Sequence, residues 1–150
     1  FFPIVQQMKI DGKYYALPTA VRSLALFWNK ALFKEAGLDP ERPPATLDEL
    51  VDYARKLTKR SPNGDLLQAG LTIDMGGQDH QWLREVLIRQ FGGAPYSTDK
   101  KTVAYNTDAG VAATQWYIDL SAKQKVGQIG FLTDGVTAFR SGKAAMTPSM

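Results

Sequence analysis

The sequence has 150 residues, 44% of them apolar and 22% charged, a composition typical of a globular domain rather than of a disordered or fibrous chain. Eighteen Lys and Arg residues against 15 Asp and Glu residues give a net charge of +3, which is too small a bias to predict binding to nucleic acid. With no Cys and a single His, His80, the chain excludes zinc ribbons, Cys-ligated iron–sulfur sites, thiol nucleophiles and His-pair metal sites. No metal or cofactor is therefore expected.

The ends of the sequence lack the usual signals of a complete chain. It begins at Phe1 without an initiator Met or a recognisable signal peptide, and it ends at Met150, directly after a predicted strand. No apolar run approaches the roughly 18 residues that a membrane span requires. We therefore expect a piece of a longer protein that does not span a bilayer within these residues.

The first predicted element is a β-hairpin. Asp11-Gly12 supplies the positive φ angles of a two-residue turn between strands at 8–10 and 13–16. Pro18 cannot donate a hydrogen bond to a neighbouring strand, so regular pairing ends there. The apolar run at 24–28 then predicts a strand covered on both faces, as in a sheet sandwiched between helices.

Two helices are predicted next. Residues 30–36 form a short helix that Gly37 ends. A capping box begins the second helix, with the Thr46 hydroxyl accepting from an early backbone N–H and Glu49 reaching back to the helix start. Apolar residues at helical spacing extend this helix to about Arg60.

The second half of the sequence continues the alternation of strands and helices. In order, it predicts a strand at 68–73, a helix from the Gly76-Gly77 turn to Gly92-Gly93, a short strand at 103–105, a helix capped by Asn106 or Thr107, a short helix from near Thr133, and a strand at 144–147. The predicted fold class is α/β, a layered sheet with helices on both faces.

Sheets of this kind bind ligands in the crevice beyond the carboxyl ends of their strands. Three segments are expected there, at 18–23, 74–82 and 148–150. Arg22 lies in the first of them. Its planar guanidinium suits donation to hydroxyls, a carboxylate or a phosphate, and an ion pair with a neighbouring carboxylate is the alternative.

The second of these segments contains two further candidates. Trp82 lies near the start of a helix, where its flat apolar face and its N–H suit contact with a sugar ring; core packing is the alternative. Asp79 is expected either to cap that helix or to contact a ligand. Trp28 and Trp116 lie on apolar stripes and are expected in the core.

Most signatures of catalysis are missing. The tripeptide Ser141-Gly142-Lys143 resembles the end of a phosphate loop, but Thr137 replaces its opening Gly and Ala144 its final hydroxyl residue. His80 is the only base available for a serine triad, and we expect it to be an exposed histidine near a helix start instead.

One enzymatic alternative remains at this stage. Asp74 and Asp79 on one loop fit the paired carboxylates of a glycosidase, which lie about 5 to 10 Å apart. A small carbohydrate-active hydrolase that uses these two residues is therefore the alternative to a binding protein.

Several motifs occur in an order that resembles a known family. They run from DGKYYALP at 11–18, LFWNK at 26–30, LFKEAGL at 32–38 and PPATLDEL at 43–50 to QFGG at 90–93 and AFRSGKAAM at 138–146. By these motifs the chain is similar to the family 1 extracellular solute-binding proteins of bacterial ABC importers, which are maltose-binding-protein-like sugar-binding proteins.

The resemblance implies a type II periplasmic-binding-protein-like fold whose two lobes close on a carbohydrate or sugar derivative without catalysis. It further implies docking on the transmembrane subunits of an ABC permease, and an extracytoplasmic location, either periplasmic or lipid-anchored at the cell surface. Residues 1–20 correspond to the end of the N-terminal lobe and the hinge crossing, and residues 21–150 to an incomplete C-terminal lobe. The implied ligand-binding residues are Arg22, Asp79, Trp82 and Ser149.

Two of these residues differ from the maltose-binding proteins, which carry an acid in place of Arg22 and an aromatic residue in place of Asp79. The resemblance therefore does not imply a maltodextrin, and an anionic solute such as glycerol phosphate is an alternative ligand. A single lobe supplies half of the contacts, so the chain alone is expected to bind its solute weakly. The sequence leaves open whether it dimerises through an exposed cleft or strand edge.

Overall fold

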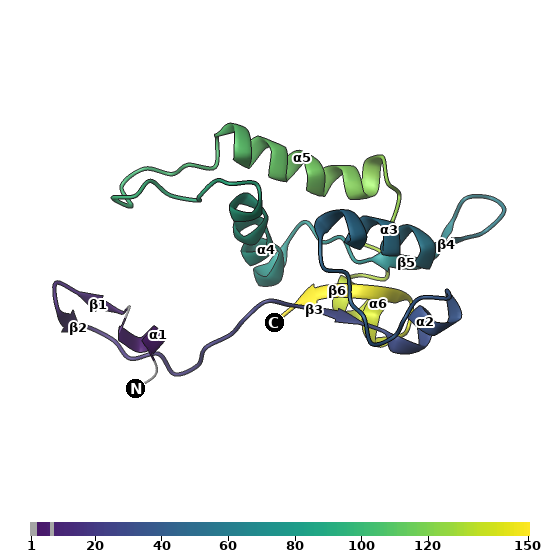
Figure 1. The fold of residues 1–150 in the computed structure, drawn as a ribbon, viewed down its shortest axis with the longest axis horizontal. Coiled ribbons are helices and arrows are strands. Elements are labelled where there is room, and N and C mark those ends of the chain that lie inside the picture. The colour runs from purple at the N-terminus through teal and green to yellow at the C-terminus, as the bar shows by residue number, and fades with distance from the viewer. Residues whose placement is uncertain (1–2, 7) are drawn as a thin grey trace.

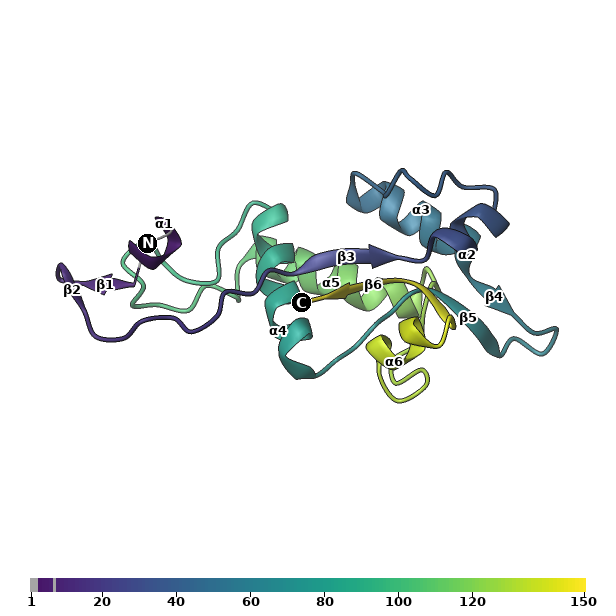
Figure 2. The same cartoon turned by 90° about the horizontal axis from the view of Figure 1, so that it is seen from below.

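In the computed structural model of the protein, residues 3–6 and 8–150 are described. The N-terminal part consists of a short helix, α1 (Pro3–Gln6), and a hairpin of β1 (Lys9–Ile10) and β2 (Lys13–Tyr14). Asp11 and Gly12 take φ angles of 50° and 77° at the turn, which confirms the predicted hairpin. An extended segment follows β2 and leaves the hairpin apart from the main sheet (Figure 1, Figure 2).

Among the described residues, the main sheet has four strands in the order β3-β6-β5-β4. β3 (Ala25–Trp28) runs antiparallel to β6 (Ala144–Ser149), and β6 runs parallel to β5 (Leu66–Leu71). The fourth strand, β4 (Lys59–Arg60), runs antiparallel to β5. These directions bring the amino end of β3 and the carboxyl ends of β5 and β6 to one edge of the sheet.

β3 forms a side edge of this sheet, and the prediction that it is buried on both faces is wrong. Leu26 and Trp28 are half-buried, whereas Ala25 and Phe27 are exposed. The side chain of Phe27 is 45% exposed. An apolar run indicates a strand, but it does not specify what covers each face.

Helices pack on both faces of the sheet, which confirms the predicted α/β class (Figure 1, Figure 2). The larger hydrophobic cluster lies between the sheet and four helices, namely α2 (Lys30–Glu35), α3 (Leu47–Leu57), α4 (Gly77–Gln90) and α5 (Asp108–Ala122). On the opposite face, Ala69 and Ala144 of the sheet pack against Ala138 of α6 (Gly135–Arg140). The core thus has two layers of helices around one sheet.

A glycine lets α3 lie directly on the sheet. A Cβ atom on Gly70 of β5 would lie 1.9 Å from the carbonyl oxygen of Ala54 in α3, which no side chain can accommodate. The Thr58 hydroxyl, just after α3, also accepts a hydrogen bond from the Gly70 N–H at 3.2 Å. Helix and strand are therefore fixed to each other at this point.

The start of α3 follows the predicted capping box with one difference. The Thr46 hydroxyl accepts from the Glu49 N–H at 3.1 Å, but the Glu49 carboxylate accepts from the N–H of Ala45 at 2.8 Å rather than from that of Thr46. The helix ends at Leu57, earlier than predicted, because the residues that follow leave it to pair with β5 as β4.

One local difference lies further along the chain. The predicted strand at 103–105 does not form, and Val103 makes a single isolated bridge with Tyr96. Of the two cap candidates, Thr107 caps α5 by accepting from the Gly110 N–H at 3.3 Å. The last helix, α6, is capped by Asp134, which accepts from the Thr137 N–H at 2.8 Å.

Candidate functional site

The three segments predicted to carry the site meet at one edge of the main sheet. The loop that begins at Asp74 and the last residues of the chain leave the parallel strands β5 and β6 at their carboxyl ends. Residues 18–23 precede β3 instead of following a strand of this sheet, and they reach the same edge because β3 is antiparallel to β6. The crevice expected of such sheets is therefore built from strand ends of both polarities.

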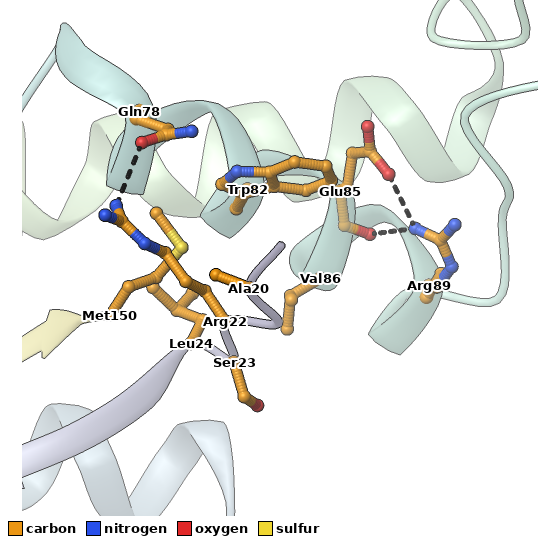
Figure 3. Close-up of a pocket in the computed structure, with 10 residues that line it drawn as sticks. All are labelled: Ala20, Arg22, Ser23, Leu24, Gln78, Trp82, Glu85, Val86, Arg89 and Met150. Atoms are coloured by element: carbon orange, nitrogen blue, oxygen red, sulfur yellow. Dashed lines mark hydrogen bonds and ion pairs between the residues drawn. The ribbon is translucent and has the colours of Figure 1, made fainter. Parts of the chain in front are cut away.

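A cleft of about 570 Å³ lies at this edge. Its walls are the extended segment before β3, one face of α4, and Met150 after β6 (Figure 3). The volume falls within the range of small-molecule sites, roughly 300 to 1,000 Å³.

Trp82 lies in the middle of the cleft, in the second turn of α4. The residue is 45% exposed, and its indole lies between Arg22 and Gln78 on one side and Glu85 and Arg89 on the other (Figure 3). Its side chain is thus not part of the core, in contrast to the half-buried Trp116, which packs against the larger cluster. An exposed flat indole with polar groups at both ends suits a ligand that is both apolar and rich in hydroxyls.

Arg22 reaches the cleft from the extended segment. Its Nη1 atom donates to Oε1 of Gln78 at 3.5 Å, the longest hydrogen bond in the cleft. Among the described residues it forms no ion pair with a carboxylate, so the alternative considered from the sequence is not what the structure contains. Most donors of the guanidinium therefore remain available to a ligand.

Asp79 does not cap α4. The helix begins at Gly77, and its cap residue, Gly76, makes no side-chain hydrogen bond. Asp79 lies in the first helical turn, and one carboxylate oxygen accepts from the Ser149 hydroxyl at 2.7 Å and from the Met150 N–H at 3.2 Å. Two of the predicted site residues, Asp79 and Ser149, are thus brought together, but as partners that connect α4 to β6.

A second hollow of about 530 Å³ adjoins the cleft and shares Gln78 with it. It lies between the loop that contains Asp74 and the start of α6. Both oxygens of the Asp74 carboxylate accept from the N–H of Gly135 at 3.2 Å, and a Cβ atom at Gly135 would lie 2.5 Å from Oδ2 of Asp74. The absence of a side chain at Gly135 therefore permits this contact.

The loop is also held from the side of α5. The Tyr117 hydroxyl donates to the backbone carbonyl of Asp74 at 2.7 Å and accepts from its N–H at 3.0 Å. Burial raises the pKa of Tyr117 to about 12, and burial also raises the pKa of Asp74. The phenol is therefore neutral and able to act as both donor and acceptor.

His80 is buried, which corrects the prediction of an exposed histidine. Its residue is 8% exposed, its ring centroid lies 5.3 Å from that of Tyr117, and Nδ1 is buried without a hydrogen-bond partner in the described chain. Burial, followed by the charge of Arg84, lowers the pKa of His80. The neutral form of His80 is therefore favoured. The residue is buried because α4 turns this position toward Tyr117 of α5 rather than toward solvent.

Asp74 and Asp79 both use their carboxylates to hold backbone or hydroxyl groups of the fold. They line the second hollow and not the cleft that contains Trp82. This arrangement gives no support to a catalytic pair at the cleft.

Three polar residues of α4 that line the cleft were not named as candidates from the sequence. They are Gln78, Glu85 and Arg89, which share one face of α4 with Trp82. Their spacing of three or four residues from one to the next was a usable signal, since residues so spaced are neighbours on a helix surface. The sequence alone does not show that this face of α4 points into the cleft.

The described residues, 3–6 and 8–150, contain neither a metal-binding cluster nor a membrane-spanning helix. No group of three or more His, Asp or Glu side chains in that part of the chain is arranged to hold a metal ion. Over the same residues, no helix combines the length and the apolar character that crossing a membrane needs.

Similarity to known proteins extends over almost the whole chain. It is 27% identical to the sn-glycerol-3-phosphate-binding periplasmic protein of Pectobacterium atrosepticum, over 98% of this chain and 33% of the relative. Solved structures match it as well. The cyclic alpha-maltosyl-1,6-maltose binding protein of Arthrobacter globiformis has a TM-score of 0.75 and 28% identity, over 97% of this chain and 36% of that one. The maltotriose-bound maltose/maltodextrin-binding domain of Bdellovibrio bacteriovorus has a TM-score of 0.77 and 26% identity, over 94% of this chain and 35% of that one.

These matches confirm the predicted type II periplasmic-binding-protein-like fold. The chain spans about a third of the length of these relatives. Residues 2–150 match the family described as bacterial extracellular solute-binding protein, which confirms the expected extracytoplasmic location and the resemblance inferred from the motifs. The chain belongs to this family of bacterial extracellular solute-binding proteins.

Proposed function

We propose that the chain is most of one lobe of a two-lobed protein that binds a carbohydrate or sugar derivative for a bacterial ABC importer. In this proposal residues 1–20 are the end of the first lobe and the hinge crossing, and residues 21–150 are an incomplete second lobe. The separation of the β1-β2 hairpin from the main sheet supports this division (Figure 1). The transmembrane subunits of the permease are the proposed protein partner.

The observation that carries the proposal is the exposed Trp82 in the cleft, with Arg22 and Gln78 at one end of its ring. A sugar ring has apolar faces that stack on an indole and hydroxyls that bond to guanidinium and amide groups at its rim. The names of the similar structures support a saccharide ligand, since these proteins bind a cyclic maltosyl-maltose and maltotriose.

Binding without bond cleavage is part of the proposal. A solute that contacts both lobes prefers the closed arrangement, and it shifts the equilibrium between open and closed forms by its difference in affinity for the two. The carboxylates of Asp74 and Asp79 hold structural partners, which supports a role without catalysis.

An anionic solute is the second candidate, and a specific observation favours it. Arg22 lies in the cleft without a carboxylate partner among the described residues, and a guanidinium in that state suits a phosphate. The similarity to a glycerol-3-phosphate-binding protein points the same way.

Isothermal titration of the two-lobed protein with neutral saccharides and with glycerol 3-phosphate tests the proposal. We expect a neutral saccharide to bind, and Arg22→Ala to weaken it only moderately. Abolition of glycerol 3-phosphate binding by Arg22→Ala would instead support the second candidate. The 150-residue chain alone is expected to bind weakly, and a micromolar dissociation constant for it would contradict that expectation. Cleavage of chromogenic glycosides that is lost in Asp79→Asn would overturn the non-catalytic role.

A further inference from the structure

A cavity of about 210 Å³ lies between α4 and α5. From α4, its lining residues are His80, Arg84, Leu87 and Ile88. Arg84 follows Trp82 by two residues, which corresponds to a rotation of about 200° around the axis of α4. The α4-α5 cavity therefore lies behind the helix that forms the wall of the cleft, and the two share no lining residue among those described.

Most of the wall of this cavity is apolar. Leu87, Ile88 and Ala113 form its buried part, and Met75 and Ile118, which are both exposed, form its outer part. No Asp or Glu of the described chain lines it. Its volume is below the roughly 300 Å³ of the smallest drug-sized sites, so it suits a small ligand with an apolar part.

Arg84 brings a positive charge to this apolar wall. The residue is exposed, and it forms no ion pair with any acid in residues 3–6 and 8–150. A guanidinium has five N–H donors in a planar fork, and a carboxylate accepts two of them side by side. The charge of the cavity is therefore complementary to an organic acid.

His80 is the second polar group of the cavity, and its hydrogen bonding is incomplete. The residue is 8% exposed, and Nδ1 has no hydrogen-bond partner in the described part of the chain. A buried polar atom in that state costs stability until a partner satisfies it. Nδ1 is shielded from solvent, so the imidazole must rotate about its Cβ–Cγ bond to offer this atom to a ligand.

We propose that the α4-α5 cavity is an accessory site for a small aliphatic carboxylate, separate from the solute cleft. In this arrangement the carboxylate pairs with Arg84 and accepts from the imidazole of His80, and the aliphatic part lies against Leu87 and Ile88. An inorganic anion would leave the apolar wall unused. An uncharged alcohol would leave the guanidinium unpaired.

The cavity is connected to the loop that leads into α4. Tyr117 lines the cavity, and its hydroxyl makes two hydrogen bonds with the main chain of Asp74. The ring centroids of His80 and Tyr117 are 5.3 Å apart, so a rotation of His80 moves a direct neighbour of Tyr117. A carboxylate that holds His80 should therefore change the affinity of the cleft for its solute, and the solute should change the affinity for the carboxylate by the same factor.

A solvated surface arginine beside a groove filled with water is the competing explanation. The chain offers a matched control for it. Arg140 of α6 is also exposed, forms no ion pair within the described residues and does not line the cavity.

The test uses the fact that His80 is the only histidine of the chain, so its imidazole signals in NMR spectra report on this site alone. The untagged 150-residue chain is titrated with butyrate at about pH 7.5, and separately with 1-butanol and with sodium sulfate at matched concentrations. We expect a saturable shift of the His80 signals with butyrate alone. A shift that does not saturate, or an equal shift with 1-butanol or sulfate, would overturn the site.

Arg84→Gln should raise the dissociation constant of butyrate by about tenfold or more, because charge-assisted hydrogen bonds are lost. Arg140→Gln should leave the constant unchanged. Thermal unfolding of both variants checks that they are folded. Equal butyrate affinity in Arg84→Gln and in the unaltered chain would overturn the assignment of Arg84.

The connection to the cleft rests on the proposed function and is tested in the two-lobed protein. Calorimetry with maltotriose or glycerol 3-phosphate, whichever binds, should show that saturating butyrate changes the affinity by about fivefold or more. Tyr117→Phe keeps the ring but not the hydroxyl, so it should retain butyrate binding and lose this change. An unchanged affinity in the unaltered protein would overturn the connection while the site stands. If neither solute binds, the proposed function fails, and the NMR titration still decides the site.

Discussion

The Asp79 carboxylate accepts a 2.7 Å hydrogen bond from the Ser149 hydroxyl, and so joins the first turn of α4 to the last residue of β6. The same carboxylate accepts from the Met150 N–H at 3.2 Å. Because α4 carries the indole of Trp82, this contact sets the position of the cleft wall relative to the sheet.

Asp79→Ala is expected to lower the free energy of unfolding by about 1 to 3 kcal/mol, because a half-buried hydroxyl and a backbone amide lose a charged acceptor. Urea denaturation of the variant measures the loss. Asp48→Ala is the control, since Asp48 lies in the first turn of α3 and is exposed. Equal losses in the two variants would mean that the helix dipole alone explains the effect.

Trp82→Ala is expected to weaken solute binding in the two-lobed protein by about thirtyfold or more, as for an aromatic residue at the centre of a binding site. Its effect on the melting temperature should be small, because the side chain is nearly half exposed. Trp82→Phe keeps a flat ring and should retain most of the affinity. Calorimetry that finds the alanine variant unchanged would remove the indole from the site.

Gly135→Ala is expected to destabilise the protein by about 1 to 3 kcal/mol, because the new methyl group would lie 2.5 Å from Oδ2 of Asp74 and 2.7 Å from Cβ of Thr72. Gly76→Ala is the matched control, since its Cβ position lies in open space. Thermal unfolding distinguishes the two. Similar melting temperatures for both variants would contradict the close approach of α6 to the loop.

The stability of the protein should fall as the pH decreases through the pKa of an unfolded histidine, about 6.5. Burial lowers the pKa of His80 in the folded state, so the unfolded chain binds the proton more readily and is favoured in this range. His80→Phe keeps a ring against Tyr117 and cannot titrate, so it should reduce the slope. Urea unfolding between about pH 7.5 and pH 5.5 measures it.

Asp74 contributes with the opposite sign. Burial raises its pKa above 3.8 in the folded state, so its protonation favours folding as the pH falls toward 3.8. An unaltered slope above pH 5.5 in His80→Phe would contradict the assignment to His80.

Signals that lie within a few residues of each other allowed much of the fold to be predicted. The Asp11-Gly12 turn and the Thr46 cap each depend on a short stretch of chain, and both form as predicted. The role of Asp79 was not predictable in this way, because its partner Ser149 is 70 residues away and meets it only through the pairing of the sheet. The same holds for Arg89, whose spacing from Trp82 is visible in the sequence but whose direction depends on how α4 packs.

The Tyr117 hydroxyl of α5 makes two hydrogen bonds with the main chain of Asp74, one as donor and one as acceptor. Helix α5 thus helps to position the loop that leads into α4, although no residue of α5 lines the cleft. A substitution that repacks α5 is therefore expected to shift this loop and the start of α4 without changing any residue that lines the cleft.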